Sequence, residues 1–310
     1  MIAKYLPEGC RTGRRENSRY LCGIKGIEEA YLCGAVIEDV ALRCNNDMSL
    51  EFDLGGIRGY MPRHESAYVI DDIVKDIAVI TRVGKAVCFK VINIIKDEKG
   101  RDTAILSRRA AQKQCLEEYL YDLIPGDIIP AKVTHLESFG AFVDIGCGIV
   151  SLLPIDSISV SRISHPTDRF EVGSNIYTVI KSIDPDRARF CVSHKELLGS
   201  WEENASRFRV GQTVAGIIRS IEEYGIFVEL SPNLAGLAEY RSGAAVGKCA
   251  SVYIKSIFPE RMKVKLVLID ISDSNINKNT EYFITPEKVQ HIDRFRYSPT
   301  CCDRVIETVF

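Results

Sequence analysis

Short stretches of alternating apolar and polar residues, bounded by glycine and proline, recur through most of the chain. A typical stretch places Ala141, Val143 and Ile145 on one side of the backbone. This two-residue period is the pattern of half-buried β-strands. Two proline-free amphipathic segments, QKQCLEEYLYDL from Gln112 and HKELLGSWEENASRF from His194, interrupt it and are typical of short helices. The chain is therefore predicted to be mainly β, with groups of strands joined by short helices.

A repeat organises these strands. The segment LIPGDIIPAKVTHLESFGAFVDIG, from Leu123, aligns without gaps with FRVGQTVAGIIRSIEEYGIFVELS, from Phe208. Further on, VGSNIYTVIKSID from Val172 aligns with VGKCASVYIKSIF from Val246, after a shorter connection in the later copy. A weaker first copy begins with SLEFDLGGIRGYMPRH at Ser49. Five short strands per copy bury a core without open edges when they close into a Greek-key barrel, so three such barrels are predicted.

The repeat divides the chain into five predicted segments. They are an unassigned N-terminal segment at 1–31, a degenerate barrel at 32–120, two barrels at 121–200 and 201–270, and a tail at 271–310. The N-terminal segment is rich in arginine and is either a basic arm or a layer packed on the first barrel. The tail is expected to be partly helical, because Pro286 stands where an amphipathic stretch begins and proline is tolerated in the first turn of a helix.

Paired aromatic residues give the sharpest indication of function. Phe139 and Phe142 flank a glycine in the second copy, and Tyr224 and Phe227 do so in the third. Residues three apart would face opposite sides of a regular strand, but a glycine between them permits a bulge that turns both rings to one surface. Bases of any identity stack on such rings, at roughly 1–3 kcal/mol per base. The alternative interpretation is that the rings fill the barrel interior.

With these motifs, the second and third copies resemble the S1 RNA-binding domain, the repeated OB-fold module of the bacterial ribosomal protein S1 family. The resemblance extends from the VGxxV-type start through FGAFV to a basic, apolar strand that ends in serine. It implies tandem five-stranded OB-fold barrels that hold RNA on one face, through two aromatic residues, a histidine, an aspartate and an arginine. The residues at these positions are Phe139, Phe142, Asp184 and Arg189 in copy two, and Tyr224, Phe227 and Lys263 in copy three.

The match is incomplete at several positions. Pro154 stands where the histidine is expected in copy two, and Glu239 and Phe258 replace the histidine and the aspartate in copy three. In the first copy Met48 and Glu51 occupy the aromatic positions, so no stacking surface is expected there. RNA contact is therefore predicted for copies two and three only.

Basic residues on the predicted strands are candidates for contacting phosphates. The set comprises Lys132, Lys181, Arg187 and Arg189 in copy two, and Arg219, Lys255, Lys263 and Lys265 in copy three. Lys263 and Lys265 share one side of a strand because side chains alternate. The competing interpretation for each is a solvated, charged edge that discourages aggregation.

Composition narrows the class of protein. Lys and Arg number 40 against 42 Asp and Glu, for a formal charge of −2, so there is no net positive field of the kind that draws in nucleic acid from a distance. The 11 cysteines form no CxxC pair, and the five histidines, His64, His135, His165, His194 and His291, lack ligand spacing and are interpreted as surface or turn residues. No metal site, cofactor or catalytic motif is predicted, and the chain is not expected to be an enzyme. Without an apolar run of spanning length, it is expected in the cytoplasm.

Two hypotheses follow. The first is a single-stranded RNA-binding protein that takes part in translation, with mRNA as its partner and with the small ribosomal subunit as a further one. The second is a scaffold whose barrels dock on the ribosome or on an RNA-degradation complex and contact RNA weakly. The altered positions Pro154, Glu239 and Phe258 favour the second, and the repeated aromatic pair favours the first.

Overall fold

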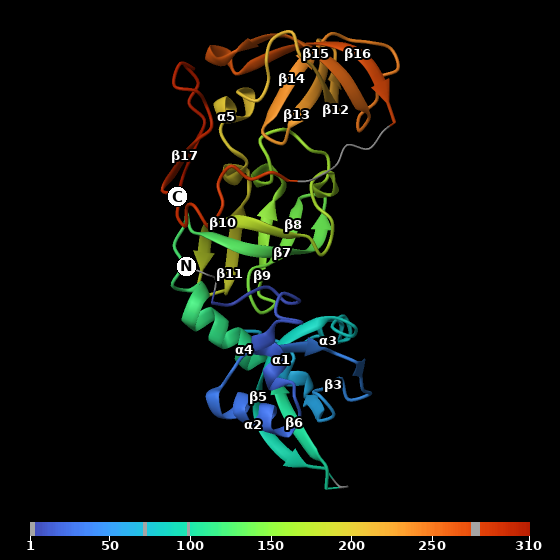
Figure 1. Ribbon diagram of the computed structural model, residues 1–310, viewed down its shortest axis with the longest axis vertical. Helices are drawn as coiled ribbons and strands as arrows, with labels where there is room; N and C mark the ends of the chain where they lie inside the picture. Colours follow the sequence, from blue (N-terminus) through green and yellow to red (C-terminus); the bar gives the residue numbers. More distant parts are fainter. Residues whose placement is uncertain (1–3, 71–72, 98–99, 274–279) are drawn as a thin grey trace.

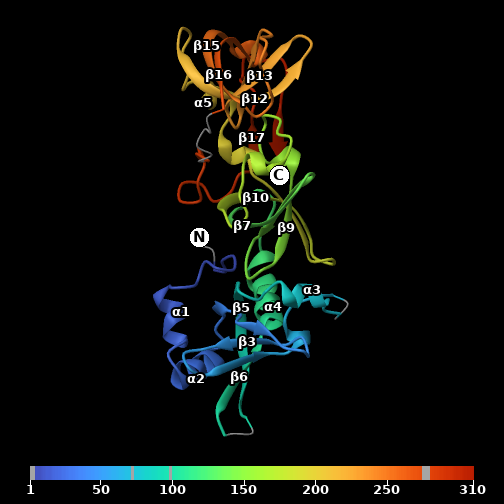
Figure 2. The same ribbon diagram turned by 90° about the vertical axis from the view of Figure 1, so that its right-hand side faces the viewer.

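The computed structural model describes residues 4–70, 73–97, 100–273 and 280–310. These form three β-units stacked end to end in an elongated molecule, with the first unit at one end and the third at the other (Figure 1). A quarter turn gives the same order (Figure 2). Each unit has its own cluster of buried apolar side chains, so the predicted mainly β architecture with tandem barrels is confirmed.

The second and third units are closed five-stranded barrels. In both, the third and fifth strands pair in parallel and the other neighbours pair antiparallel, the arrangement expected for an OB-type barrel. The second barrel contains β7 (Ile128–Glu137), β8 (Gly140–Asp144), β9 (Val150–Pro154), β10 (Asn175–Asp184) and β11 (Arg189–Ser193). The third contains β12 (Thr213–Glu222), β13 (Gly225–Ser231), β14 (Leu234–Ala238), β15 (Cys249–Phe258) and β16 (Lys263–Ser272).

The first unit is a six-stranded sheet in the order β1-β5-β6-β4-β3-β2. Its strands are β1 (Ile37–Val40), β2 (Arg43–Cys44), β3 (Leu50–Asp53), β4 (Arg58–Met61), β5 (Ala86–Lys96) and β6 (Asp102–Ser107). The two outer strands, β1 and β2, follow one another with only Ala41 and Leu42 between them. The Ala41 N–H bonds to Lys85 on the β5 side, and the Leu42 N–H bonds to Glu51 in β3. The first barrel strand is thus broken in two, which makes this copy the irregular one.

Short helices cover and join these units. The N-terminal segment forms α1 (Arg15–Tyr20) and α2 (Ile24–Cys33) and packs on the first unit, which also carries η1 (Arg63–Glu65) and α3 (Asp76–Ile80). The predicted linkers are α4 (Arg108–Cys115) with η2 (Leu116–Leu120), and η5 (Lys195–Leu198) with α5 (Trp201–Ala205). Further single turns are η3 (Ile155–Ser157), η4 (Pro166–Asp168) and η6 (Pro259–Arg261). The first linker starts before Gln112, because the Ser107 hydroxyl accepts a hydrogen bond from Ala110 and caps the helix at that point.

The N-terminal segment also joins the first and second barrels. Glu8 lies between them, where its carboxylate accepts hydrogen bonds from Arg108 at 2.7 Å and from the Cys88 N–H at 3.1 Å. The Glu8 N–H donates to the Asp144 carboxylate at 2.7 Å. Glu8, Arg108 and Asp144 are all buried, so this polar cluster lies beside the apolar contacts, including those of Tyr5 and Cys88, at the junction.

The helical tail predicted from Pro286 was wrong. Within residues 280–310 the tail has no helix and instead forms a two-stranded sheet of β17 (Arg294–Arg296) and β18 (Glu307–Val309). After a single turn at Thr285, the backbone runs along the second barrel, where Gln290 accepts from Ile128 and Ile292 donates to Gly126, both at 2.9 Å. These bonds use the groups that a helix would have needed.

The tail therefore returns from the third barrel to lie beside the second, as the red segment does in Figure 1. The Phe283 N–H bonds to Leu197, and the Trp201 N–H bonds to the Tyr297 carbonyl. The Tyr297 hydroxyl donates to the carbonyl of Asn233 in the third barrel at 2.6 Å. The tail thus contacts both later barrels and the linker between them.

His194 holds part of this arrangement and makes it sensitive to acid. The interpretation of His194 as a surface or turn residue was wrong, because it is fully buried between the Ile158 carbonyl, 2.8 Å from Nδ1, and the Tyr282 hydroxyl, 3.1 Å from Nε2. Burial lowers the pKa of His194 from 6.5 to about 4, so the folded chain keeps it neutral where an unfolded chain would take up a proton. Its contribution to stability is complete above pH 6.5 and is lost as the pH falls towards 4.

A His194→Gln variant is accordingly expected to lose less free energy of unfolding between pH 7 and pH 4.5 than the unchanged chain does, by about 2–3 kcal/mol. Urea unfolding at a series of pH values measures this difference. His64→Gln, which removes an exposed histidine, is the control and should follow the unchanged chain. Parallel pH profiles for the His194 variant and the unchanged chain would contradict the assignment.

Candidate nucleic-acid interface

Two matching pairs of aromatic rings lie on the outside of the second and third barrels. Phe139 is 54% exposed, and its ring centroid lies 5.9 Å from that of Phe142 at an interplanar angle of 86°. Tyr224 is 69% exposed and lies 6.0 Å from Phe227 at 88°. We call these the second-barrel platform (Phe139 and Phe142) and the third-barrel platform (Tyr224 and Phe227). The two platforms therefore have the same edge-to-face ring geometry, although one begins with a phenylalanine and the other with a tyrosine.

The rings share a surface for a reason that the sequence did not indicate. The pairing of β8 with β9 is regular from Gly140 to Asp144, so the aromatic strand carries no bulge. Phe139 instead lies in the hairpin turn before β8, and the shift in register falls in the facing strand, between Val133 and His135. The third barrel repeats this shift between Ile218 and Ser220.

The glycine within each aromatic motif permits close approach of two strands. A Cβ on Gly140 would lie 2.5 Å from the Leu153 carbonyl oxygen, and one on Gly225 would lie 2.5 Å from that of Ala238. Gly225 also has a φ of 146°, which side chains rarely adopt. The glycine therefore sets how closely the aromatic strand meets its neighbour.

The rings do not fill the barrel interior. On β8, Ala141 and Val143 are fully buried, whereas Phe142 between them is only half-buried. In β13, Ile226 and Val228 are likewise buried on either side of Phe227. Because side chains alternate along a strand, the aromatic positions face outwards and leave their ring faces available for stacking.

Neighbouring strands extend the second-barrel platform. His135, opposite Phe142 in register, is exposed and stacks with it at a centroid distance of 6.3 Å and an interplanar angle of 24°. On the other side, Phe142 pairs with Leu152, which in turn pairs with Cys191. His135 had been interpreted as a surface or turn residue, and only the shifted register of β7 shows that it adjoins the aromatic ring.

Lys265 lies beside the third-barrel platform, at the position that Cys191 occupies in the second barrel. Phe227 pairs with Leu237, and Leu237 pairs with Lys265, so these three residues form one row across β13, β14 and β16. The Lys265 ammonium also lies 5.6 Å from the ring centre of Phe258. Lys263, the predicted equivalent of an arginine, lies two residues away on the same face, and its register partner is Phe258. The sequence predicted that the two lysines face the same side of a strand, because side chains alternate along it.

The other predicted residues of copy two lie at its last hairpin. Asp184 and Arg189 pair across β10 and β11, and the Arg187 N–H donates to the Asp184 carboxylate at 3.3 Å in the turn between them. Arg189 is exposed on the face of Cys191, two residues along β11. Lys181 is exposed and lies where the pairing of β10 with β11 shifts by one residue. Lys255 has the matching position in the third barrel and is also exposed. All of these side chains remain open to solvent except that of Asp184, which is half-buried.

Two predicted RNA contacts have other partners in the structure. The Lys132 ammonium donates to the Glu8 carbonyl at 3.1 Å and so holds the N-terminal segment. The Arg219 side chain is 7% exposed and lies between Glu229, at 2.8 Å, and Asp168, at 3.2 Å. Neither side chain belongs to an RNA-contacting surface, because the charged groups of both are already engaged by other parts of the chain.

The first barrel offers no comparable surface. Met48 lies in a turn with a φ of 61°, and Glu51 is buried and forms ion pairs with Arg43 and Arg58. Charged and sulfur-containing side chains therefore stand where the other barrels place rings. Among the described residues, no group of three or more potential ligands suited to a metal ion occurs, and no helix is long and apolar enough to cross a membrane.

The second and third units are closed five-stranded barrels with an outward aromatic pair next to basic residues, an arrangement that resembles S1-type barrels. In agreement, residues 122–195 match the family model described as the S1 RNA binding domain. The chain is also related to the small ribosomal subunit protein bS1 of bacteria. It is 29% identical to the bS1 homolog of Bacillus subtilis over 71% of this chain and 56% of that protein, and 30% identical to bS1 of Mycobacterium tuberculosis over 69% and 46%.

The chain thus spans about half the length of these relatives. A solved structure of a multidomain protein with nucleic acid binding domains from Streptococcus pneumoniae is 14% identical, with a TM-score of 0.25, over 78% of this chain and 76% of that one.

Proposed function

We propose that this protein binds single-stranded RNA through its second and third barrels. The observation that carries the proposal is the repeated platform: Phe139 with Phe142, and Tyr224 with Phe227, meet at nearly the same distance and angle on the outside of two barrels. The rings face outwards from the barrel core, and they match what single-strand binding requires. The S1 domain match at residues 122–195 supports the same reading.

The mechanism is stacking assisted by local positive charge, without a catalytic step. Bases stack on the exposed rings, while Arg189 and Lys181 on the second barrel, and Lys263 and Lys265 on the third, contact phosphates. The formal charge of the chain is −2, so these contacts act at short range and do not attract RNA from afar. Binding is therefore expected to weaken with salt, with a slope that reflects a few phosphates.

The named relatives are proteins of the small ribosomal subunit, so we propose that the RNA is mRNA and that the protein acts in translation, in the cytoplasm. The first barrel, which lacks a platform, would then serve as a docking or structural unit. A scaffold that contacts RNA only weakly accounts less well for the structure, because it gives two intact platforms little role.

Fluorescence titration of the intact protein with labelled single-stranded RNA, duplex RNA and single-stranded DNA tests the proposal. We expect binding of single strands at micromolar concentrations or below, weaker at the higher of two salt concentrations, and weaker still for the duplex, whose bases are already stacked on one another. Equal affinity for the duplex and the single strand would contradict a stacking mechanism.

A further inference from the structure

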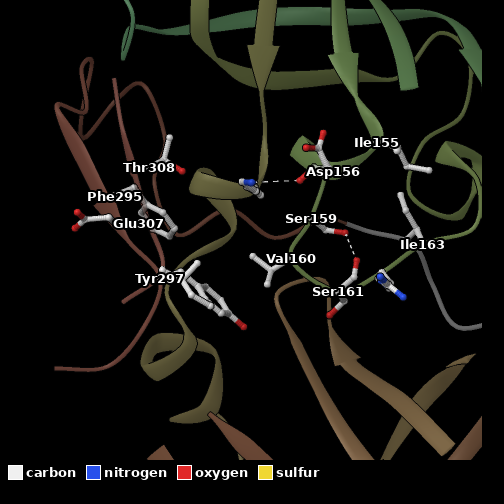
Figure 3. Close-up of a pocket in the computed structure, with 13 residues that line it drawn as sticks. Ile155, Asp156, Ser159, Val160, Ser161, Ile163, Phe295, Tyr297, Glu307 and Thr308 are labelled. Atoms are coloured by element: carbon white, nitrogen blue, oxygen red, sulfur yellow. Dashed lines mark hydrogen bonds between the residues drawn. The ribbon is translucent and has the colours of Figure 1, made fainter. Parts of the chain in front are cut away.

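A cavity of about 430 Å³ lies between the second barrel, the following linker and the C-terminal tail (Figure 3). Its walls come from three segments far apart in the sequence. The loop after β9 contributes Ile155, Val160 and Ile163, the linker contributes Lys195, and the tail contributes Phe295 and Tyr297. Cavities of this size commonly hold small organic groups. Because the tail forms one wall, the cavity belongs to this arrangement of segments and not to an isolated barrel.

The cavity begins next to the second-barrel platform. The Ile155 N–H donates to the Phe139 carbonyl at 3.0 Å, and Pro154 pairs with Gly140. The platform and the cavity wall are thus joined by backbone pairing between the start of β8 and the end of β9. An RNA strand whose base stacks on the exposed Phe139 ring therefore lies beside a residue that contacts the cavity lining directly.

The lining suits a nucleotide. Phe295 and Tyr297, which are 8% and 7% exposed, form an apolar wall of the cavity together with Val160 and Ile163. The Tyr297 ring is fixed because its hydroxyl donates to the Asn233 carbonyl at 2.6 Å. Figure 3 shows the Ser159 hydroxyl directed at Ser161, a bond of 2.9 Å to its carbonyl, on the opposite side of the cavity from the tail.

Positive charge is also present. Arg162 is exposed, and Lys195 places its ammonium 3.2 Å from the Asp156 carbonyl, a neutral acceptor. Both residues line the cavity, so it offers cations to a phosphate group. Two acids, Asp156 and Glu307, line it too, and Glu307 is paired with Arg294 at 3.6 Å. The combination of apolar walls and cations fits a nucleotide better than a wholly apolar ligand.

We propose that this cavity binds the nucleotide next to those stacked on the second-barrel platform, with its base against the apolar walls and its phosphate near Arg162 and Lys195. The inference rests on the proposed function and deepens it, since it adds a separate subsite to the same RNA path. The tail then shapes a part of the RNA-binding surface as well as joining the barrels.

The test uses the intact chain and oligouridylates lengthened one nucleotide at a time. For the unchanged protein, affinity should rise roughly five-fold or more at the length that first reaches the cavity. An Arg162→Ala, Lys195→Ala double variant should lose that rise and keep its affinity for shorter oligomers. An abasic nucleotide at the position of the rise should abolish the rise in affinity for the unchanged protein, because the base is then missing.

The matched control is the double variant Lys25→Ala, Lys85→Ala, which removes two exposed cations from the first unit. It should behave as the unchanged protein does.

The outcomes separate the subsite from the function. Equal losses at every length in the double variant, or no loss at any length, would overturn the subsite and leave the platforms in place. So would a rise that persists with the abasic oligomer. Absence of binding at all lengths to the unchanged protein would overturn the proposed function and the subsite together. Thermal unfolding of each variant checks that the fold is intact.

Discussion

Simultaneous Phe142→Ala and Phe227→Ala substitutions are expected to weaken the binding of single-stranded RNA that spans both barrels by about thirty-fold or more. Each change removes a stacking partner worth at least roughly 1 kcal/mol, and two such losses on one strand add to about 2 kcal/mol. Each single variant should lose about five-fold or more. Titration of the same labelled RNA against the four proteins measures the effect.

Both rings are half-buried, so the loss of affinity has to be separated from a loss of structure. The unfolding transitions of the variants serve this purpose. Tyr31→Ala, which removes a ring that is 44% exposed in α2 of the N-terminal segment, is the aromatic control and should retain full affinity. If the double variant binds as tightly as the control, the platforms do not hold RNA.

The second large effect concerns the junction between the second and third barrels. Glu229→Gln is expected to lower the free energy of unfolding by about 3–5 kcal/mol, because it removes the carboxylate that pairs with the buried Arg169 and leaves Arg219 with Asp168 alone. Glu229 lies 2.5 Å from Arg169 and 2.8 Å from Arg219, and all three side chains are 6–7% exposed. Burial lowers the pKa of Arg169, an effect that the Glu229 charge opposes.

Glu281→Gln is the matched control. It interrupts an ion pair with Arg207 at 2.7 Å in which the Glu281 side chain is 71% exposed, and exposed pairs contribute about 1 kcal/mol or less. Urea unfolding should therefore show a clearly larger loss in the free energy of unfolding for Glu229→Gln than for Glu281→Gln. A loss below about 1 kcal/mol for Glu229→Gln would show that solvent or neighbouring groups compensate the arginines, contrary to the burial of the network.

The sequence predicted some residues of the candidate RNA-binding surface and missed others. Phe142 and Phe227 were found because a repeated motif marks them, and their outward orientation follows from the alternation of β8 and β13. His135 was missed because its place beside Phe142 depends on a register shift in the facing strand, which leaves no mark in local composition. Arg219 has the charge and strand position expected of a phosphate contact, but its side chain is directed into the junction towards Glu229.

The same distinction holds for the whole chain. The sequence by itself determined the tandem barrels, the linking helices and the aromatic motifs, because alternation, turn residues and internal repeats are local properties of the chain. Only the tertiary structure decided the split first strand, the placement of Glu8 between two barrels and the return of the tail along β7. These features depend on hydrogen-bonding groups and charges that find partners in other strands or other barrels, and the preference of a segment for a helix yields when such partners are present.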